Sequence, residues 1–186
     1  MSARDIMTEI KKHPQIKTVV FTGGEPLIQL MNSNAYDTLF NALEVRQYKI
    51  EIETNGILLD DDFIDVDYIT QYNISPKFES NTTFDWRVKY LNKEFEGAIN
   101  NIKTTHNYQI KFVLESGDKR EQCIANIKEF IDYHKIPTKM VYIMSEGQTK
   151  QQQNEAMKDD LELCLNEGWN YTPRLHILVY DEKRGV

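Results

Sequence analysis

The sequence predicts an α/β fold in the form of a partial (β/α) barrel, with about six parallel strands and outer helices. Runs of β-branched and aromatic residues alternate along the chain with segments of helical periodicity. Strands that alternate with helices build a parallel sheet, because right-handed crossovers place the helices on its outside. A closed eight-stranded barrel takes about 250 residues, and this chain has 186. We therefore expect an open sheet that forms only part of a barrel.

Six segments have the composition of strands. Residues 17–22 (KTVVFT) are rich in β-branched and aromatic side chains, which is typical of a buried strand. Residues 48–53 (YKIEIE) alternate between apolar and charged side chains, as a strand between a core and a polar face does. The expected strands are 17–22, 48–53, 67–74, 108–114, 138–143 and 174–180.

Apolar residues at helical spacing indicate the helices between these strands. Ile6 and Ile10 lie one turn apart in a segment that ends near Pro14, and Gly168 is a good stop for the long helix before it. Residues 79–92 are polar and aromatic and predict an excursion. We expect residues 1–186 to form a single domain, with helices at 3–12, 34–46, 92–102, 118–134 and 150–167 and a short helix before residue 67.

Composition excludes several classes of protein. The net charge is −7, from 22 basic and 29 acidic residues, which argues against a broad nucleic-acid-binding face. No apolar run approaches the ~20 residues of a membrane helix, and the first residues lack the apolar core of a secretory signal. The two cysteines, Cys123 and Cys164, form no disulfide framework and no zinc knuckle. They indicate a reducing, cytoplasmic compartment, and both are expected to be buried on helices.

In a parallel β/α sheet the chemistry is found at the carboxyl ends of the strands. The polar and glycine residues at these ends are Thr22 to Pro26, Glu53 to Gly56, Ser75 to Lys77, Glu115 with Ser116, Met144 to Gly147, and His176 on the last strand.

Each of these residues has a structural interpretation beside the functional one. Gly23 and Gly24 allow backbone conformations that bring a ligand close, with the Glu25 carboxylate beside them for an ammonium group, or they form a plain turn. Glu53 at a strand end needs a partner, which is a ligand or a protein group. Lys77 is an anion ligand or a solvated lysine, and His176 is a ligand or a hydrogen-bonded core histidine.

Taken together, the strand-end segments resemble one family. VVFTGGEP at 19–26 is similar to the GGEP motif of the radical S-adenosylmethionine superfamily. IEIETNG at 50–56, ISPK at 74–77, QIKFVLES at 109–116, VYIMSEGQT at 141–149 and PRLHILVYDEKRGV at 173–186 narrow the resemblance to the 7-carboxy-7-deazaguanine synthases, over about residues 3–186.

The resemblance implies an activity and a set of ligands. The family converts 6-carboxy-5,6,7,8-tetrahydropterin to 7-carboxy-7-deazaguanine with loss of ammonia, in the queuosine and deazapurine pathway. It is a radical lyase family that uses S-adenosyl-L-methionine, a [4Fe–4S] cluster and Mg²⁺. By the matched motifs, Gly23, Gly24, Glu25, Ser75 and Lys77 would bind S-adenosylmethionine, and Thr22, Glu53, His176 and the Val186 carboxylate would bind the pterin.

The sequence departs from the family at the iron–sulfur cluster. The superfamily holds its cluster with a CxxxCxxC loop after the first strand, and these 186 residues contain no such motif. We expect the chain to match the family from its second strand onward, with the first strand of the family missing. Three hypotheses follow: the C-terminal portion of an enzyme that acts with an N-terminal complementing fragment, a catalytically dead relative that binds S-adenosylmethionine or a pterin, and a scaffold without enzymatic activity. A homodimer is the expected assembly, with no direct nucleic-acid or membrane partner.

Overall fold

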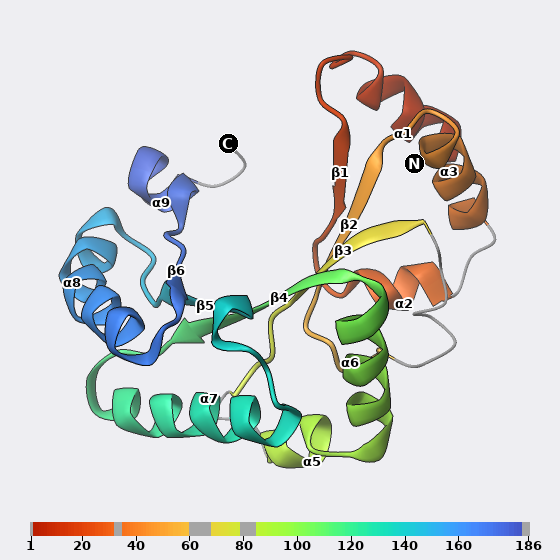
Figure 1. Ribbon diagram of the computed structural model, residues 1–186. Helices are drawn as coiled ribbons and strands as arrows, with labels where there is room; N and C mark the ends of the chain where they lie inside the picture. The colour runs from red at the N-terminus through yellow and green to blue at the C-terminus, as the bar shows by residue number, and fades with distance from the viewer. Residues whose placement is uncertain (1, 32–34, 60–67, 79–84, 184–186) are drawn as a thin grey trace. The chain divides into compact units, whose positions relative to one another are not determined.

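The computed structural model describes residues 2–31, 35–59, 68–78 and 85–183, and it has the expected α/β architecture (Figure 1). Its strands form one six-stranded sheet in chain order, β1-β2-β3-β4-β5-β6. The pairings of β1 with β2, β2 with β3, β4 with β5 and β5 with β6 are parallel. The prediction of a six-stranded α/β fold is confirmed. The chain groups into two compact units, Met1–Ile74 with Asn92–Tyr108, and Ser75–Leu91 with Gln109–Val186.

The first unit is a parallel three-stranded arrangement with its helices. Helices α1 and α3 contact each other beside the strands (Figure 1). Ser2 begins α1 with a capping box, in which its hydroxyl accepts from the Asp5 amide and the Asp5 carboxylate accepts from the Ser2 amide. The elements are α1 (Ala3–Ile10), β1 (Thr18–Phe21), α2 (Pro26–Met31), α3 (Ala35–Glu44), β2 (Lys49–Thr54), β3 (Ile69–Ile74), α6 (Lys93–Thr105) and the start of β4 (Asn107–Leu114).

Strand β2 shows why this unit has one apolar and one polar face. Ile50, Ile52 and Thr54 are buried, and the alternate residues Glu51 and Glu53 are only partly covered. On the neighbouring strand, Asn73 donates from Nδ2 to Glu51 Oε2 at 3.1 Å, and Gln71 Nε2 donates to Asn73 Oδ1 at 2.7 Å. The second face of the sheet therefore carries a hydrogen-bonded row of polar side chains instead of a dry core.

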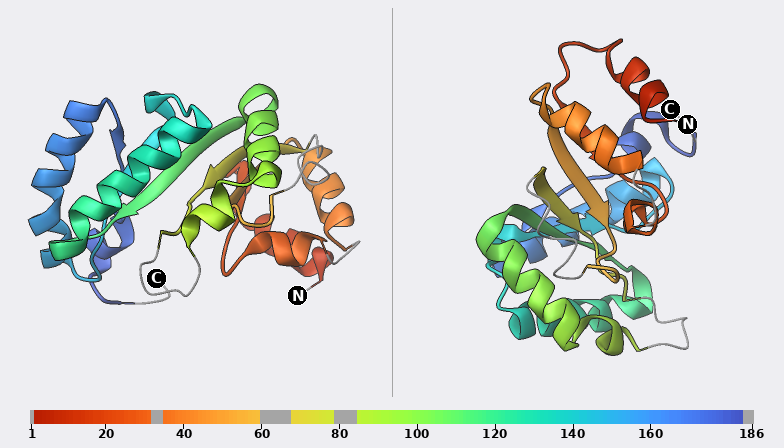
Figure 2. Two further views of the ribbon diagram at one scale, coloured as in Figure 1. Left: turned by 90° about the horizontal axis from the view of Figure 1, so that it is seen from below. Right: turned by 90° about the vertical axis from the view of Figure 1, so that its right-hand side faces the viewer.

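The second unit contains the rest of β4, followed by β5 and β6. Helix α8 packs against β5, β6 and α9, as the two views of Figure 2 show for the blue end of the chain. An aromatic cluster fills its core, with the rings of Phe78 and Phe112 stacked at 5.3 Å between centroids. The elements are α5 (Trp86–Tyr90), η1 (Gly117–Lys119), α7 (Arg120–His134), η2 (Thr138–Met140), β5 (Val141–Ser145), α8 (Lys150–Glu167), β6 (Asn170–Tyr171) and α9 (Leu175–Tyr180).

The predicted strand at 174–180 is wrong, because these residues form helix α9. Strand β6 has only two residues, and Pro173 then interrupts the pairing because proline has no amide hydrogen to donate. The Arg174 carbonyl accepts from the amides of Ile177 and Leu178 at 2.9 and 3.1 Å, which begins the helix. A short apolar run such as LHILVY fits a strand and a helix equally well by periodicity.

Two further helices lie where the sequence predicts only a turn and an excursion. Helix α2 begins directly after the glycine turn, with Pro26 at its first position, where a proline costs no hydrogen bond. Helix α5 lies inside the predicted excursion and is capped by Asp85, whose carboxylate accepts from the Arg87 amide at 3.0 Å. Both helices are one or two turns long, too short to show a hydrophobic period.

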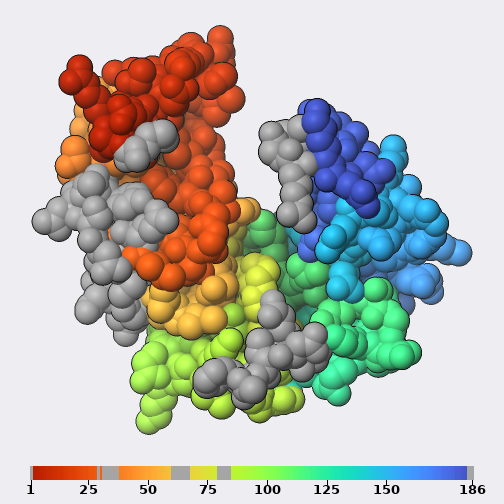
Figure 3. Space-filling view, turned by 180° about the vertical axis from the view of Figure 1, so that it is seen from behind, coloured from red at the N-terminus to blue at the C-terminus, as the bar shows by residue number. Residues whose placement is uncertain are grey.

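The two C-terminal helices present apolar side chains to solvent. Helices α8 and α9 lie side by side at the surface (Figure 3), and Leu165, Leu175 and Val179 are each more than half exposed. Isolated exposed apolar residues are common on protein surfaces. Within the described part of the chain, no helix combines the length and the apolar character that crossing a bilayer requires.

Gly56, directly after β2, provides a test of this packing. Its φ is +85°, and an added Cβ would lie 2.9 Å from Phe95 Cε2 and 3.0 Å from Ile74 Cγ2. We expect Gly56→Ala to lower the free energy of unfolding by about 2–4 kcal/mol, from a left-handed backbone and an overpacked core. Gly24→Ala is the matched control, because Gly24 also has positive φ (+58°) but open space around it, and it should cost only about 1–2 kcal/mol. Equal losses in urea unfolding would contradict the packing described here.

Candidate functional site

The Glu25 carboxylate joins the glycine turn after β1 to the end of β2. Its Oε1 accepts from Thr54 Oγ1 at 2.7 Å and from the Leu27 amide at 3.2 Å, and its Oε2 accepts from the Asn55 amide at 2.9 Å. A carboxylate has about four acceptor positions, so three of them serve the protein. Glu25 therefore acts first as a latch between two strand ends.

The glycines before this latch leave backbone open to a ligand. Gly23 and Gly24 have φ values of +96° and +58°, which explains why glycine is needed there. No heavy atom lies within 4 Å of a Cβ built on either residue. Their backbone is not buried by neighbouring side chains, and a ligand could approach it closely.

Thr22 and Glu53, which the sequence predicts at neighbouring strand ends, are brought together. Thr22 Oγ1 donates to Glu53 Oε2 at 3.0 Å. Phe21 pairs with Ile52 in the parallel register of β1 and β2, which places the next residues of both strands side by side. Glu53 lies on the polar face of the sheet, in the same row as Glu51 and Asn73. The pair presents carboxylate and hydroxyl oxygens at the mouth of two strands.

Ser75 and Lys77 follow β3 and belong to the second unit. Lys77 Nζ donates to Ser75 Oγ at 3.2 Å, and the Lys77 amide donates to the Tyr90 hydroxyl at 3.0 Å. Lys77 lines a cavity of about 230 Å³. The other residues of this cavity include the aromatic rings of Phe78 and Phe112, so a charged group and a flat apolar wall face the same space.

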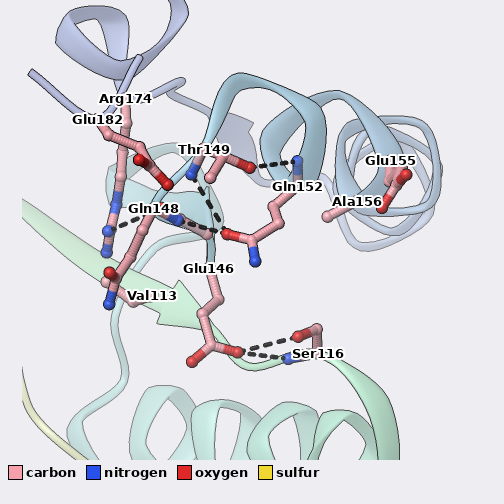
Figure 4. Close-up of a pocket in the computed structure, with 11 residues that line it drawn as sticks. Val113, Ser116, Glu146, Gln148, Thr149, Gln152, Glu155, Ala156, Arg174 and Glu182 are labelled. Atoms are coloured by element: carbon pink, nitrogen blue, oxygen red, sulfur yellow. Dashed lines mark hydrogen bonds between the residues drawn. The ribbon is translucent and has the colours of Figure 1, made fainter.

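A larger cavity of about 910 Å³ lies at the ends of β4 and β5 (Figure 4). Val113, Glu146 and Arg174 line both this cavity and the smaller one, so the two share a wall. Glu146 is held by the end of β4, because its Oε2 accepts from the Ser116 amide and hydroxyl, both at 3.0 Å. Figure 4 shows Glu146 and Arg174 reaching into the pocket from different segments.

Buried polar residues hold the loop that forms one wall of this pocket. Gln153 is fully buried, and its Nε2 donates to the carbonyls of Ser145 at 2.9 Å and Gly147 at 3.2 Å. Ser145 Oγ donates to Asp160 Oδ2 at 2.5 Å and contacts the Tyr171 hydroxyl at 2.9 Å. The loop after β5 is therefore fixed from below by helix α8.

The buried Asp160 is neutralised by an arginine. Asp160 is inaccessible to solvent and forms an ion pair with Arg120, at the first residue of α7. Burial and the nearby Asp160 charge raise the pKa of Tyr171, and its hydrogen bond with Ser145 opposes them. Tyr171 stays neutral at physiological pH. The ion pair joins α7 to α8, and the hydrogen bonds of Ser145 with Asp160 and Tyr171 extend this network to β5 and β6.

The two cysteines, Cys123 and Cys164, are buried on separate helices, as predicted. Burial raises the pKa of Cys164 to about 11 and also raises that of Cys123. Among residues 2–31, 35–59, 68–78 and 85–183, no group of three or more His, Cys, Asp or Glu side chains could hold a metal ion.

For two residues of the predicted site the structure gives no support. His176 is on α9 instead of a strand, is exposed, and is not among the residues that line the two cavities above. Val186 lies outside the described residues. Arg174, which lines both cavities, is missed by the sequence reasoning, because the strand predicted at 174–180 drew attention to His176. Ser116 and Glu146 are among the residues that the sequence predicts at the carboxyl ends of strands.

Comparison with known proteins finds relatives of one kind, although no model of a protein family matches the chain. The 7-carboxy-7-deazaguanine synthase of Halobacterium salinarum is 27% identical over 195 residues, which cover 98% of this chain and 72% of the relative. The enzyme of the same name from Pyrobaculum aerophilum is 27% identical, over 100% of this chain and 75% of its own length. That of Rhodopirellula baltica is 27% identical, over 92% and 64%. The resemblance drawn from the motifs is thus confirmed.

A solved structure gives the same fold. Streptococcus suis SuiB bound to S-adenosylmethionine superposes with a TM-score of 0.59 and 15% identity, over 98% of this chain. This chain spans 44% of that protein. The likeness supports the partial barrel architecture.

The Glu25 latch is tested by removing its carboxylate. We expect Glu25→Ala to lower the free energy of unfolding by about 1–3 kcal/mol, because the Thr54 hydroxyl and the Asn55 amide lose a charged acceptor. Hydrogen exchange at the Asn55 amide should accelerate. The control is Glu9→Ala, which removes an exposed ion pair with Lys12 and should change stability by less than about 1 kcal/mol. Equal stability of the two variants would show that Glu25 is not a latch.

Proposed function

We propose that this chain is the major part of a 7-carboxy-7-deazaguanine synthase, which converts 6-carboxy-5,6,7,8-tetrahydropterin to 7-carboxy-7-deazaguanine and ammonia. The observation that carries the proposal is that relatives of this name align with 92–100% of the chain. Loss of ammonia accounts for every atom of the conversion, so it needs no net oxidant. The strand-end groups described above supply polar contacts for both a cofactor and a substrate.

We infer from the matched motifs which residues of this chain would bind S-adenosyl-L-methionine. The open backbone at Gly23 and Gly24 would accept the methionyl ammonium group, with Glu25 beside it. Ser75 and Lys77 would contact the nucleoside and the carboxylate of the cofactor. When it is bound, the cofactor supplies the organic radical that starts chemistry in this superfamily. The part of this chain is to bind and orient the cofactor.

The polar face of the first unit suits a pterin substrate. Glu53 carries a carboxylate, already oriented by Thr22, which could accept from the paired N–H groups of an aminopyrimidine ring. Such an edge offers two donors to one carboxylate, as a guanidinium does. His176 and the Val186 carboxylate remain candidate substrate contacts through the matched motif alone.

The iron–sulfur cluster does not fit the residues of this sequence. A [4Fe–4S] cluster needs closely spaced thiolates, and the two cysteines here are buried thiols on separate helices. We assign no step to the cluster or to Mg²⁺ within these residues. In the proposed enzyme the cluster ligands come from residues outside this sequence. Strand β1 lies at one end of the strand order, where an unpaired edge can accept another strand.

The proposal is tested by expressing the natural gene region, with its flanking DNA, in a bacterium that lacks its own 7-carboxy-7-deazaguanine synthase. We expect 7-carboxy-7-deazaguanine to appear by mass spectrometry. Glu53→Gln should reduce the product at least tenfold, because the amide puts a donor where substrate donors are expected. Glu51→Gln, on the same face, is the control. A stable protein that yields no product, or that binds S-adenosylmethionine without turnover, would contradict the proposal.

The cluster assignment is tested on the 186 residues alone. We expect the purified chain, given iron and sulfide without oxygen, to develop no absorbance near 400 nm and to release no 5′-deoxyadenosine from S-adenosylmethionine. The reason is that Cys123 and Cys164 are buried on separate helices, whereas a cluster needs closely spaced thiolates. Cluster absorbance that disappears in the Cys123→Ala variant would contradict this account.

A further inference from the structure

Arg174 is a cation in the wall of the pocket, and no carboxylate of the described residues lies within ion-pair distance of its guanidinium. It lines both cavities of the second unit. Its Nη1 donates to the Gly147 carbonyl at 3.3 Å, and its Nε lies 3.3 Å from the Met144 sulfur, which is a weak acceptor. None of the ion pairs among the described residues involves Arg174. Two of its five N–H groups are used in these long contacts, and three remain.

The segment that carries Arg174 is fixed at several points. The Thr172 amide donates to the Ile143 carbonyl at 2.8 Å, just before Pro173 ends the strand. The Arg174 carbonyl begins α9, and Asp181 at the end of this helix accepts from the Lys150 amide at 2.9 Å. Gly147, which accepts from the guanidinium, is itself held by the buried Gln153. The guanidinium is therefore held in place before any ligand arrives, which lowers the entropic cost of binding.

The charges around the pocket select the kind of anion. Glu146, Glu155 and Glu182 line the larger cavity with Arg174. Three carboxylates against one guanidinium disfavour a doubly charged phosphate. A single carboxylate matches the planar fork of an arginine and carries one charge. Among the described residues, Glu146 Oε1 has no hydrogen-bond partner. This oxygen can therefore accept a hydrogen bond from an N–H group of a ligand.

We propose that Arg174 is the receptor for the carboxylate of the small molecule bound in this pocket, with Glu146 receiving an N–H group of the same ligand. The proposal rests on the proposed function for the identity of the ligands. Both S-adenosylmethionine and a 6-carboxylated pterin combine one carboxylate with N–H donors. Arg174 is thus a specificity residue, which separates a carboxylated ligand from the same molecule without its carboxylate.

The experiment is a set of calorimetric titrations with two pairs of probes. One pair is S-adenosyl-L-methionine and decarboxylated S-adenosylmethionine, and the other is 6-carboxypterin and pterin. The proteins are the wild-type chain, Arg174→Gln, Arg174→Lys and Arg46→Gln. Arg46 is the matched control because it is exposed, donates to the Ala42 carbonyl at 2.8 Å, and its loss changes the net charge equally. Thermal unfolding of each variant is measured alongside.

We expect the wild type and Arg46→Gln to bind the carboxylated member of one pair roughly 10- to 100-fold more tightly than its partner. Arg174→Gln should bind both members alike, and Arg174→Lys should lie between, because lysine keeps the charge but loses the fork. The pair that loses its discrimination identifies the source of the carboxylate.

Four results would overturn the inference. If Arg174→Gln still discriminates, another residue receives the carboxylate. If the wild type binds both members of each pair alike, the inference fails while the proposed function stands. If the wild type binds none of the probes, the inference fails, whereas the proposed function is decided by product formation from the natural gene region. Tighter binding of inorganic phosphate than of either carboxylated probe would also overturn it.

Discussion

The carboxyl ends of the strands in a parallel sheet all lie on the same side of the sheet. The loops that follow these ends have no strand pairing to hold them. Side chains must supply that support, since exposed backbone at a strand end is otherwise free to move. In the first unit the Glu25 carboxylate does this, by accepting hydrogen bonds from the end of β2 and from the start of α2. The open backbone of Gly23 and Gly24 is held in place because the residue after it is anchored.

The second unit meets the same requirement with a buried network. Gln153 holds the carbonyls of the loop after β5, and Asp160 holds Ser145 at the end of that strand. The ion pair with Arg120 neutralises the Asp160 charge, whose burial alone would cost several kcal/mol by general estimates. In each unit a carboxylate thus holds a strand end through hydrogen bonds.

Much of the fold follows from the sequence, because strands such as KIEIET and helices such as α1 have clear periods. The exceptions have physical reasons. Residues 175–180 form a helix because Pro173 ends the pairing of β6, an effect of one residue that periodicity does not reveal. Helices α2 and α5 are too short to show a period.

The candidate site was predictable in part. Thr22 and Glu53 could be predicted as neighbours, because they follow paired parallel strands. Glu146 and Ser116 could be predicted because they follow the carboxyl ends of strands. That Glu25 is largely satisfied by the protein was not predictable, because its partners Thr54 and Asn55 are 29 and 30 residues away. Arg174 was not predictable for a similar reason. Only the structure shows that its guanidinium lines a pocket and forms no ion pair among the described residues.

The most direct test of the central claim is hydrogen–deuterium exchange of the full chain with and without S-adenosyl-L-methionine. The account predicts slower exchange in the ligand's presence at residues 22–27 and 54–57, where Glu25 joins two strand ends, and at residues 145–149, where Gln153 holds the pocket loop. Unchanged exchange in all these segments at saturating ligand, or protection confined to other parts of the chain, would contradict the claim that supported strand ends form the binding site.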